Sequence, residues 1–267
     1  ANRRYGPDAV TAMSLELSTT RLAMKLSGFV DLSADEHQAL QAAAGAVRLY
    51  RPHETLTRER DANTHVNLLL TGFACRCKVL PDGRRQIIGY LIPGDLCDAR
   101  QLILRTGTHA VSTLTAVKTV VFSREALQSL VHRWPRIAQA LCCLTLVEEM
   151  IEREWLVNVG QRTALERLAH LFCEIFVRMR AAGLADSDRC ELPLTQMELA
   201  DTLALSTVHI NRTLQELRRQ GFVSVSGGML EIHDFAALQS LAMFNPDYLH
   251  VGADFLDWGD RRLTGPF

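Results

Sequence analysis

Residues 194–221 read LTQMELADTLALSTVHINRTLQELRRQG, which is the pattern of two short helices joined by a tight turn. Thr195 and Glu198 stand at the spacing of a capping box, which marks the start of a helix. Ser206 is placed to cap the second helix, whose apolar residues recur at helical spacing and predict a buried face. The residues of this face are Ile210, Leu214 and Leu217.

The next stretch, FVSVSGGMLEIHD at 222–234, predicts two short strands around a Gly-Gly turn. A helix, a short turn, a second helix and a hairpin form the layout of the winged helix-turn-helix, which binds DNA. The alternative is a helical hairpin used for protein contact. The acidic residues Glu198, Asp201 and Glu216 keep that alternative open, because they prevent the stretch from being a basic patch.

If the apolar face is turned inward, the start of the second helix carries outward side chains that are suited to reading base edges. They are Thr207, Val208, His209, Asn211 and Arg212. Phosphate contacts are expected at the two helix starts, where free backbone N–H groups attract anions, and from two later cations. These positions are Thr195, Ser206, Arg218 and Arg219.

Short β-rich runs separated by turn residues occupy 46–122, and the PDG at 81–83 is a strong hairpin signal. Closely spaced strands of this kind predict an antiparallel β-roll of the jelly-roll type. Before them, Ser33 and Glu36 form another capping box and predict a short helix. The expected fold class is therefore α+β, with a β-roll, a long helix and a winged helix-turn-helix.

A long helix is predicted from Pro135 to about Asn158. One stripe along it has alternating spacings of four and three residues, which is typical of a helix packed along a partner helix. Its apolar members are the predicted dimer interface: Ile137, Leu141, Leu144, Ile151 and Trp155. The alternative is a helix that lies on its own sheet. The residues Leu146, Val147 and Met150 favour the dimer, because they give the helix apolar surface on a second side.

Gly160 interrupts this pattern and is expected to act as a hinge, after which Thr163 and Glu166 cap a further amphipathic helix. The predicted organisation therefore has five parts. They are an amino-terminal arm (1–30), a sensor-like β-roll (31–134), a dimerisation helix with hinge (135–160), the winged helix-turn-helix (161–245) and a carboxy-terminal tail (246–267).

The composition is that of a soluble globular protein, since 48% of the 267 residues are hydrophobic and 22% are charged. The sequence contains no uncharged apolar run long enough to predict a membrane span. Its first residues lack the apolar core of a secretory signal. Seven irregularly spaced cysteines favour reduced thiols over a disulfide framework. We therefore expect a cytoplasmic protein with no membrane partner.

The order of β-roll, long helix, hinge and winged helix resembles the CRP/FNR transcription regulators from about Leu32 to Asp234. The likeness is most specific over 194–221 and includes Arg212, which this family uses to reach guanine. The resemblance implies a bacterial homodimer that binds a two-fold-symmetric operator in double-stranded DNA and works with RNA polymerase. Val208 departs from the family pattern, because it stands where many members have a base-reading Glu; contact with a thymine methyl would replace that readout.

The resemblance also implies a cyclic-nucleotide pocket in the β-roll, but the phosphate cassette departs from the family pattern. Gly94 and Asp95 resemble its Gly-Glu pair, while the position of its phosphate-binding Arg falls on Gly107 or Thr108. Arg105 would reach the phosphate only after a loop rearrangement. We therefore expect a regulator that cAMP does not control, with a cyclic-nucleotide-responsive member that has an altered pocket as the alternative.

Other candidate effector positions lie outside the cassette. Glu148 and Glu152 fall where cyclic-nucleotide-binding members meet the purine, and a phosphate facing carboxylates is costly to bury. The first cysteine is Cys75, so the amino-terminal cysteine cluster of the iron–sulfur branch is absent. Cys97 lies near the haem-ligand position of another branch, but a packed thiol is the default for a single cysteine, and no cofactor is expected.

An enzyme is not expected from this sequence. It offers no clear pair of nucleophile and base and no zinc-binding motif, and its β-roll has only the scattered histidines His65 and His109. The alternative outside the regulator class is a cupin-like metal enzyme with an accessory winged helix.

Overall fold

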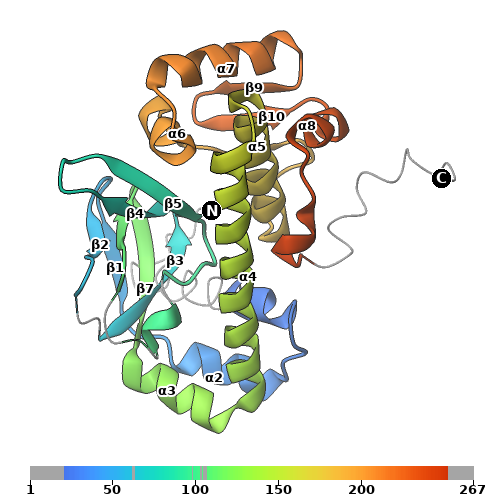
Figure 1. Cartoon of the computed structure of the whole chain (residues 1–267). Helices are drawn as coiled ribbons and strands as arrows, with labels where there is room; N and C mark the ends of the chain where they lie inside the picture. Colours follow the sequence, from blue (N-terminus) through green and yellow to red (C-terminus); the bar gives the residue numbers. More distant parts are fainter. Residues whose placement is uncertain (1–20, 62–63, 98, 103, 105–106, 252–267) are drawn as a thin grey trace, which may run out of the picture. The chain divides into compact units, whose positions relative to one another are not determined.

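The computed structural model describes residues 21–61, 64–97, 99–102, 104 and 107–251. The chain divides into two compact units, and Figure 1 shows the elements of each. The first unit is Ala1–Lys78 with Gly89–Leu146, and the second is Val79–Ile88 with Val147–Phe267. The predicted α+β class is confirmed, with antiparallel sheets in the first unit and the helix-turn-helix with its hairpin in the second.

The β-roll contains two sheets, of order β1-β7-β3 and β2-β6-β4-β5. Its strands are β1 (Val47–Tyr50), β2 (Thr55–Thr57), β3 (His65–Thr71), β4 (Ala74–Val79), β5 (Arg85–Leu91), β6 (Ala110–Thr113) and β7 (Val117–Ser123). Strands β1 and β3 pair antiparallel with β7, while β2 and β4 pair antiparallel with β6. This is the arrangement that the closely spaced runs and turns predict.

Strand β3 is buried on both faces. Side chains alternate across a strand, so neighbouring residues point to opposite sides of the sheet. Leu68 and Leu70 accordingly belong to one apolar cluster, and Leu69 belongs to another. The continuous apolar run at the centre of β3 therefore joins the two parts of the core of the first unit.

Helices cover the larger of these clusters. They are the helical residues 21–27, α2 (Ala34–Ala42), α3 (Arg124–Arg133) and the first half of α4 (Pro135–Gln161). Leu22 and Leu26 are buried in this cluster, so the prediction of an arm is wrong for residues 21–27. The rest of the predicted arm, residues 1–20, lies outside the described residues. The capping box of α2 is confirmed, because the Ser33 N–H donates to Glu36 Oε2 at 2.8 Å.

The PDG turn forms the predicted hairpin between β4 and β5. Gly83 has a φ of +86°, a left-handed conformation that glycine adopts without strain. The Leu80 N–H donates to the Arg84 carbonyl at 2.8 Å, and the Arg84 N–H donates to Asp82 Oδ1 at 3.1 Å. The tip of this hairpin is grouped with the second unit.

The second unit combines the end of α4 with the winged helix-turn-helix. Its further elements are α5 (Ala164–Ala181), β8 (Arg189–Glu191), α6 (Gln196–Leu203), α7 (Thr207–Arg219), β9 (Val223–Ser226), β10 (Met229–Ile232), α8 (Phe235–Ala242) and the 3-10 helix η2 (Pro246–Leu249). Strands β9 and β10 form the predicted wing, and β8 pairs antiparallel with β10 as a third strand. The sequence pattern does not predict strand β8.

Two boundaries differ from the sequence prediction. Helix α4 continues through Gly160 to Gln161, so the join to α5 lies at Arg162 and Thr163 and not at the glycine. The predicted tail from 246 is wrong for its first residues, because η2 is ordered and Leu249 is only 5% exposed. The remaining predicted tail, 252–267, lies outside the described residues.

The helix at 21–27 provides a test of the revised amino-terminal boundary. Leu26→Ala should lower the free energy of unfolding by about 2–5 kcal/mol, because Leu26 is fully buried and its truncation leaves a cavity. Met24→Ala on the same helix is the matched control, since Met24 is 59% exposed and should change stability by less than about 0.5 kcal/mol. Urea unfolding measures both variants, and equal small effects would contradict the packing of this helix.

Candidate nucleic-acid interface

Local hydrogen bonds set the geometry of α6 and α7. The Thr195 N–H donates to Glu198 Oε2 at 2.7 Å and the Glu198 N–H donates to Thr195 Oγ1 at 3.2 Å, so the predicted capping box is confirmed. Ala204 ends α6 in the left-handed region, with φ 53° and ψ 44°, which turns the chain sharply. Ser206 then caps α7, because its Oγ accepts a hydrogen bond from the His209 N–H at 3.2 Å.

Helix α7 has one buried face and one exposed face. Its apolar stripe is buried as predicted, with exposed fractions of 0% for Ile210, 5% for Leu214 and 0% for Leu217. The opposite face is exposed at every position that was predicted to read bases: Thr207, Val208, His209, Asn211 and Arg212. Val208 has 71% of its surface exposed. Figure 1 shows α7 together with α6 and the β9–β10 wing.

The two polar side chains at the middle of this face are available for an outside partner. Within the described part of the chain, no hydrogen bond or ion pair holds the side chain of Asn211 or Arg212. An amide and a guanidinium of this kind match the paired donors and acceptors on adenine and guanine edges. The exposed start of α7 can therefore bind base edges without first breaking internal contacts.

The two phosphate contacts predicted at helix starts, Thr195 and Ser206, have different surroundings. The backbone N–H of Thr195 already donates to the buried carboxylate of Glu198, so the reading of Thr195 as a free backbone donor for phosphate is wrong. Ser206 lies exposed at the start of α7, whose first turn contains no acidic residue, so its helix dipole favours an anion.

The two cations at the end of α7 are engaged within the protein. Arg218 Nη2 donates to the Val225 carbonyl and ties the helix to the wing strand β9. Arg219 forms a two-point ion pair with Glu216, with Nη2 at 2.6 Å and Nε at 2.9 Å from the carboxylate oxygens. Hydrogen bonds from Arg219 and Gln220 lower the pKa of Glu216 to about 2, so the carboxylate stays charged and offsets the guanidinium.

A cation from the hairpin tip compensates another acid of the helix-turn-helix. Within the second unit, Arg85 Nε lies 2.7 Å from Asp201 Oδ2 on α6, and Gln86 Nε2 donates to the Thr202 carbonyl at 3.0 Å. Asp201 therefore pairs with Arg85 and not with a cation of α7. Among the three acids named there, only Glu216 pairs with a cation of α7.

The predicted dimer stripe of α4 is largely buried inside the chain itself. Ile137, Leu141 and Leu144 lie in the apolar cluster of the first unit, beside residues of β3 and β7. Trp155 is 7% exposed and donates from Nε1 to Glu174 on α5 at 2.9 Å; Ile151 is half-buried. The alternative of a helix lying on its own sheet is therefore correct for the first half of this stripe.

A different stripe of α4 is exposed. It includes Leu146, Leu156 and Val157, with 51%, 76% and 47% of their surfaces accessible. Cys142 and Arg153 are exposed on the same helix. The sequence pattern did not identify the buried residues of α4, because apolar residues occur on both sides of this helix and periodicity alone does not say which side meets the protein's own core.

The predicted cassette residues lie in a tightly bonded loop of the first unit. Asp95 is 4% exposed, its Oδ1 lies 2.5 Å from Lys25 Nζ, and its Oδ2 accepts from the Ile92 N–H at 3.0 Å. Cys97 is buried, and its carbonyl accepts a hydrogen bond from Arg76 Nε at 3.3 Å. Lys25 comes from the helix at 21–27, which the sequence reading did not include in this loop.

The other candidate effector residues belong to different units. Thr108 is exposed, while Arg105 lies outside the described residues. Glu148 is 8% exposed and Glu152 is half-buried, both on the half of α4 that belongs to the second unit.

The described residues give no support to the metal-enzyme alternative. Across these ranges, no group of three or more His, Cys, Asp or Glu side chains is arranged to hold a metal ion. All seven cysteines are free thiols, as their spacing predicts. None of the described helices combines the length and the apolar character that crossing a membrane requires.

Comparisons with known proteins agree with both units. Residues 166–241 match the model of the Crp-like helix-turn-helix domain, and residues 47–133 match that of the cyclic nucleotide-binding domain. The chain is 31% identical over 197 residues to the transcriptional activator protein FnrL of Cereibacter sphaeroides, covering 72% of this chain and 78% of the relative. It is 30% identical over 191 residues to the nitrogen fixation regulation protein FixK of Bradyrhizobium diazoefficiens, covering 71% and 78%.

A solved structure shows the same likeness in three dimensions. The structure of FixK2 from Bradyrhizobium japonicum superposes with a TM-score of 0.66 at 25% sequence identity. The match covers 74% of this chain and 96% of FixK2.

Proposed function

The chain belongs to the CRP/FNR family of DNA-binding transcription regulators, and from this premise we propose that it acts as a homodimer on a two-fold-symmetric operator. One observation carries the proposal. Helix α7 buries its apolar stripe and leaves five base-reading candidates exposed, with Asn211 and Arg212 uncommitted among the described residues. A helix of this kind fits the major groove of DNA.

Base readout is assigned to the exposed start of α7. Arg212 supplies the forked donor that fits the two acceptors of guanine, and Asn211 and His209 supply further polar groups. Val208 offers an exposed apolar surface for a thymine methyl. Thr207 is assigned to base readout with them, and the backbone around Ser206 is assigned to phosphate contact at the start of the helix.

The homodimer is assigned to the exposed stripe of α4. The stripe has the alternating spacings of four and three that helices packed side by side show, and its members are Cys142, Leu146, Glu149, Arg153 and Leu156. Its two charged members, Glu149 and Arg153, form an ion pair with each other at 2.6 Å. Leu146 and Leu156 are more than half exposed, and a second copy of α4 would bury both. This stripe replaces the buried one as the proposed dimer interface.

Several further properties are proposed from family membership. The regulator works in the cytoplasm with RNA polymerase as an additional partner, without a membrane partner and without catalytic activity. Its β-roll responds to a signal other than cAMP or no longer responds to a small molecule. The Lys25–Asp95 ion pair supports this view, because Asp95 is already committed in the loop that resembles the cassette. Cys97 is buried as a packed thiol, so no haem is proposed.

Arg212→Ala tests the readout. It should cost about 1–3 kcal/mol per half-site and remove the preference for one G, because it deletes the forked donor. Arg219→Ala is the matched control: Glu216 already offsets its charge, so any loss should be small and equal for all sequences. Binding-site selection followed by titration measures both effects. An unchanged G preference in Arg212→Ala would overturn the assignment.

A pair of neighbouring substitutions tests the dimer interface. Leu146→Glu should yield a folded monomer, because it places charge in the proposed seam. Leu144→Glu should instead unfold the first unit, because Leu144 is 1% exposed and a carboxylate there has no partner. Sedimentation velocity and urea unfolding distinguish the two outcomes. A Leu146→Glu variant that remains dimeric would contradict this interface.

The response to cyclic nucleotides separates the proposal from its alternative within the family. A ligand at about a hundred times its dissociation constant adds about 2.7 kcal/mol of stability, which raises the melting temperature measurably. Neither cAMP nor cGMP should produce this rise, whereas selected operator DNA should, and it serves as the positive control. A clear rise with either nucleotide would establish an altered but working pocket.

A further inference from the structure

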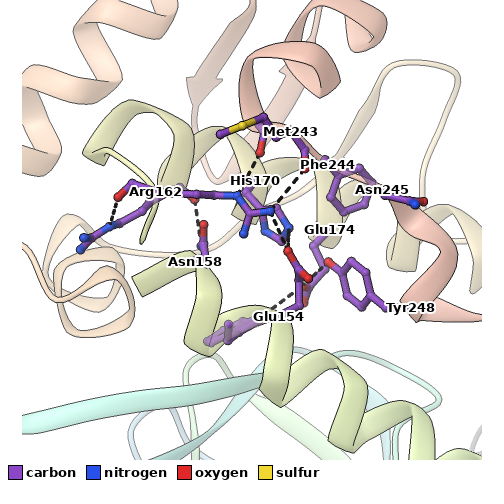
Figure 2. A network of polar contacts seen from close by, with 12 residues as sticks. Glu154, Asn158, Arg162, His170, Glu174, Met243, Phe244, Asn245 and Tyr248 are labelled. Atoms are coloured by element: carbon purple, nitrogen blue, oxygen red, sulfur yellow. Dashed lines mark hydrogen bonds and ion pairs between the residues drawn. The ribbon is translucent and has the colours of Figure 1, made fainter. Parts of the chain in front are cut away.

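A buried polar cluster joins three segments of the second unit (Figure 2). The segments are the end of α4, helix α5, and the residues that follow α8. The cluster consists of Glu154, Trp155, Asn158, Arg162, His170, Glu174 and Tyr248, together with backbone groups at Ala242 and Met243. It has no part in the proposed contacts with DNA, and sequence reasoning did not find it.

Arg162 connects the first and third segments. It lies between α4 and α5 and is 9% exposed. Its Nη2 lies 2.6 Å from Glu154 Oε1 on α4, its Nε donates to the Ala242 carbonyl at 3.1 Å, and its Nη2 also donates to the Met243 carbonyl at 3.3 Å. Met243 ends α8 in the left-handed region, with φ 48° and ψ 44°. A buried guanidinium held in this way ties the end of α4 to the segment after α8.

Glu174 connects all three segments. This residue of α5 is fully buried, and its Oε2 accepts hydrogen bonds from Trp155 Nε1 on α4 at 2.9 Å and from the Tyr248 hydroxyl at 2.8 Å. Arg178 Nη1 lies 3.4 Å from Oε1. Burial has the largest effect and raises the pKa of Glu174, although the charge of Arg178 and the hydrogen bonds from these donors oppose the shift. Removal of any donor would leave a buried carboxylate oxygen less well satisfied.

His170 on α5 packs against two aromatic side chains of the segment that follows α8. Its ring packs edge-on to Phe244 at 5.2 Å between centroids and stacks with Tyr248 at 6.1 Å. Burial and the nearby Arg162 lower the pKa of His170 to about 3, so the ring is neutral at physiological pH. A neutral ring packs against the two aromatic side chains without opposing the charge of Arg162. The segment after α8 is thus held over α5 by both packing and hydrogen bonds.

We propose that residues 243–249, defined here as the clasp, fix the end of α4 relative to α5, with Arg162 and Tyr248 as positioning residues for the two half-sites. This inference rests on the proposed function, because it concerns a dimer bound to an operator that has two half-sites. Only Arg162 and the cap residue Thr163 separate α4 from α5. Helix α7 packs against α5, and the end of α4 carries exposed seam residues such as Leu156. The clasp therefore sets the recognition helix relative to the dimer seam.

Such a clasp has a consequence that can be measured. When the second half-site binds intramolecularly, its contribution depends on whether the linked module is held at the right distance and angle. With a rigid join, the dimer binds operators with half-sites about 34–36 Å apart more tightly than operators with other spacings. A loosened join weakens binding to the paired operator and flattens its dependence on spacing, while binding to a single half-site is unchanged.

The experiment compares full-length protein with a deletion of residues 243–267. Deletion of 252–267 is the matched control, because it leaves the clasp in place. The probes are duplexes that carry one selected half-site, two half-sites one helical turn apart, or two half-sites with five additional base pairs between them. The clasp deletion should lose at least tenfold in affinity for the one-turn operator and less than twofold for the single half-site, and the control should match the wild type.

Tyr248→Phe and Arg162→Lys keep the test decisive if the deletion does not fold. Each retains most of the side chain but removes the hydroxyl or the forked donor. Each should weaken binding to the one-turn operator several-fold without changing single-half-site affinity. Equal loss on both probes, or no loss on either, would overturn the clasp. A wild-type protein that binds one and two half-sites equally would instead overturn the proposed homodimer.

Discussion

The charged groups buried where α4 meets α5 constrain the rest of the second unit. A carboxylate that is fully buried, as at Glu174, requires donors, and here they come from Trp155, Tyr248 and Arg178. Those donors belong to three segments that are distant in sequence, so the chain must bring the segments together before the charge is satisfied. Since α7 packs on α5, the position of the recognition helix depends on this buried site.

The elements that the sequence predicts well are those held by contacts between near neighbours. The capping boxes at Ser33 and Thr195 and the PDG turn each use residues within four positions, so their patterns are visible in the sequence itself. The same reasoning identified the buried and exposed faces of α7, because its apolar residues lie on one side only.

Predictions failed where tertiary contacts choose between equivalent local patterns. Helix α4 has apolar residues on two sides, and only the packed structure shows that Leu144 faces the core while Leu146 faces outward. The bond between Tyr248 and Glu174 spans 74 positions and has no sequence signature. Strand β8 is three residues long, and pairing with β10 stabilises it more than any propensity of its own.

The electrostatics of α7 explain why the pairing of two half-sites matters for this chain. The net charge of the whole chain is −1. On α7, Glu216 offsets Arg219, and Arg218 is hydrogen-bonded to the wing. Few cations on α7 are then free to contact phosphate, although such contacts supply most non-specific DNA affinity. Arg212 gives sequence preference more than general attraction. In the proposed dimer, tight binding would then come from joining two weak half-site contacts, and a rigid join between α4 and α5 would make the second contact nearly intramolecular.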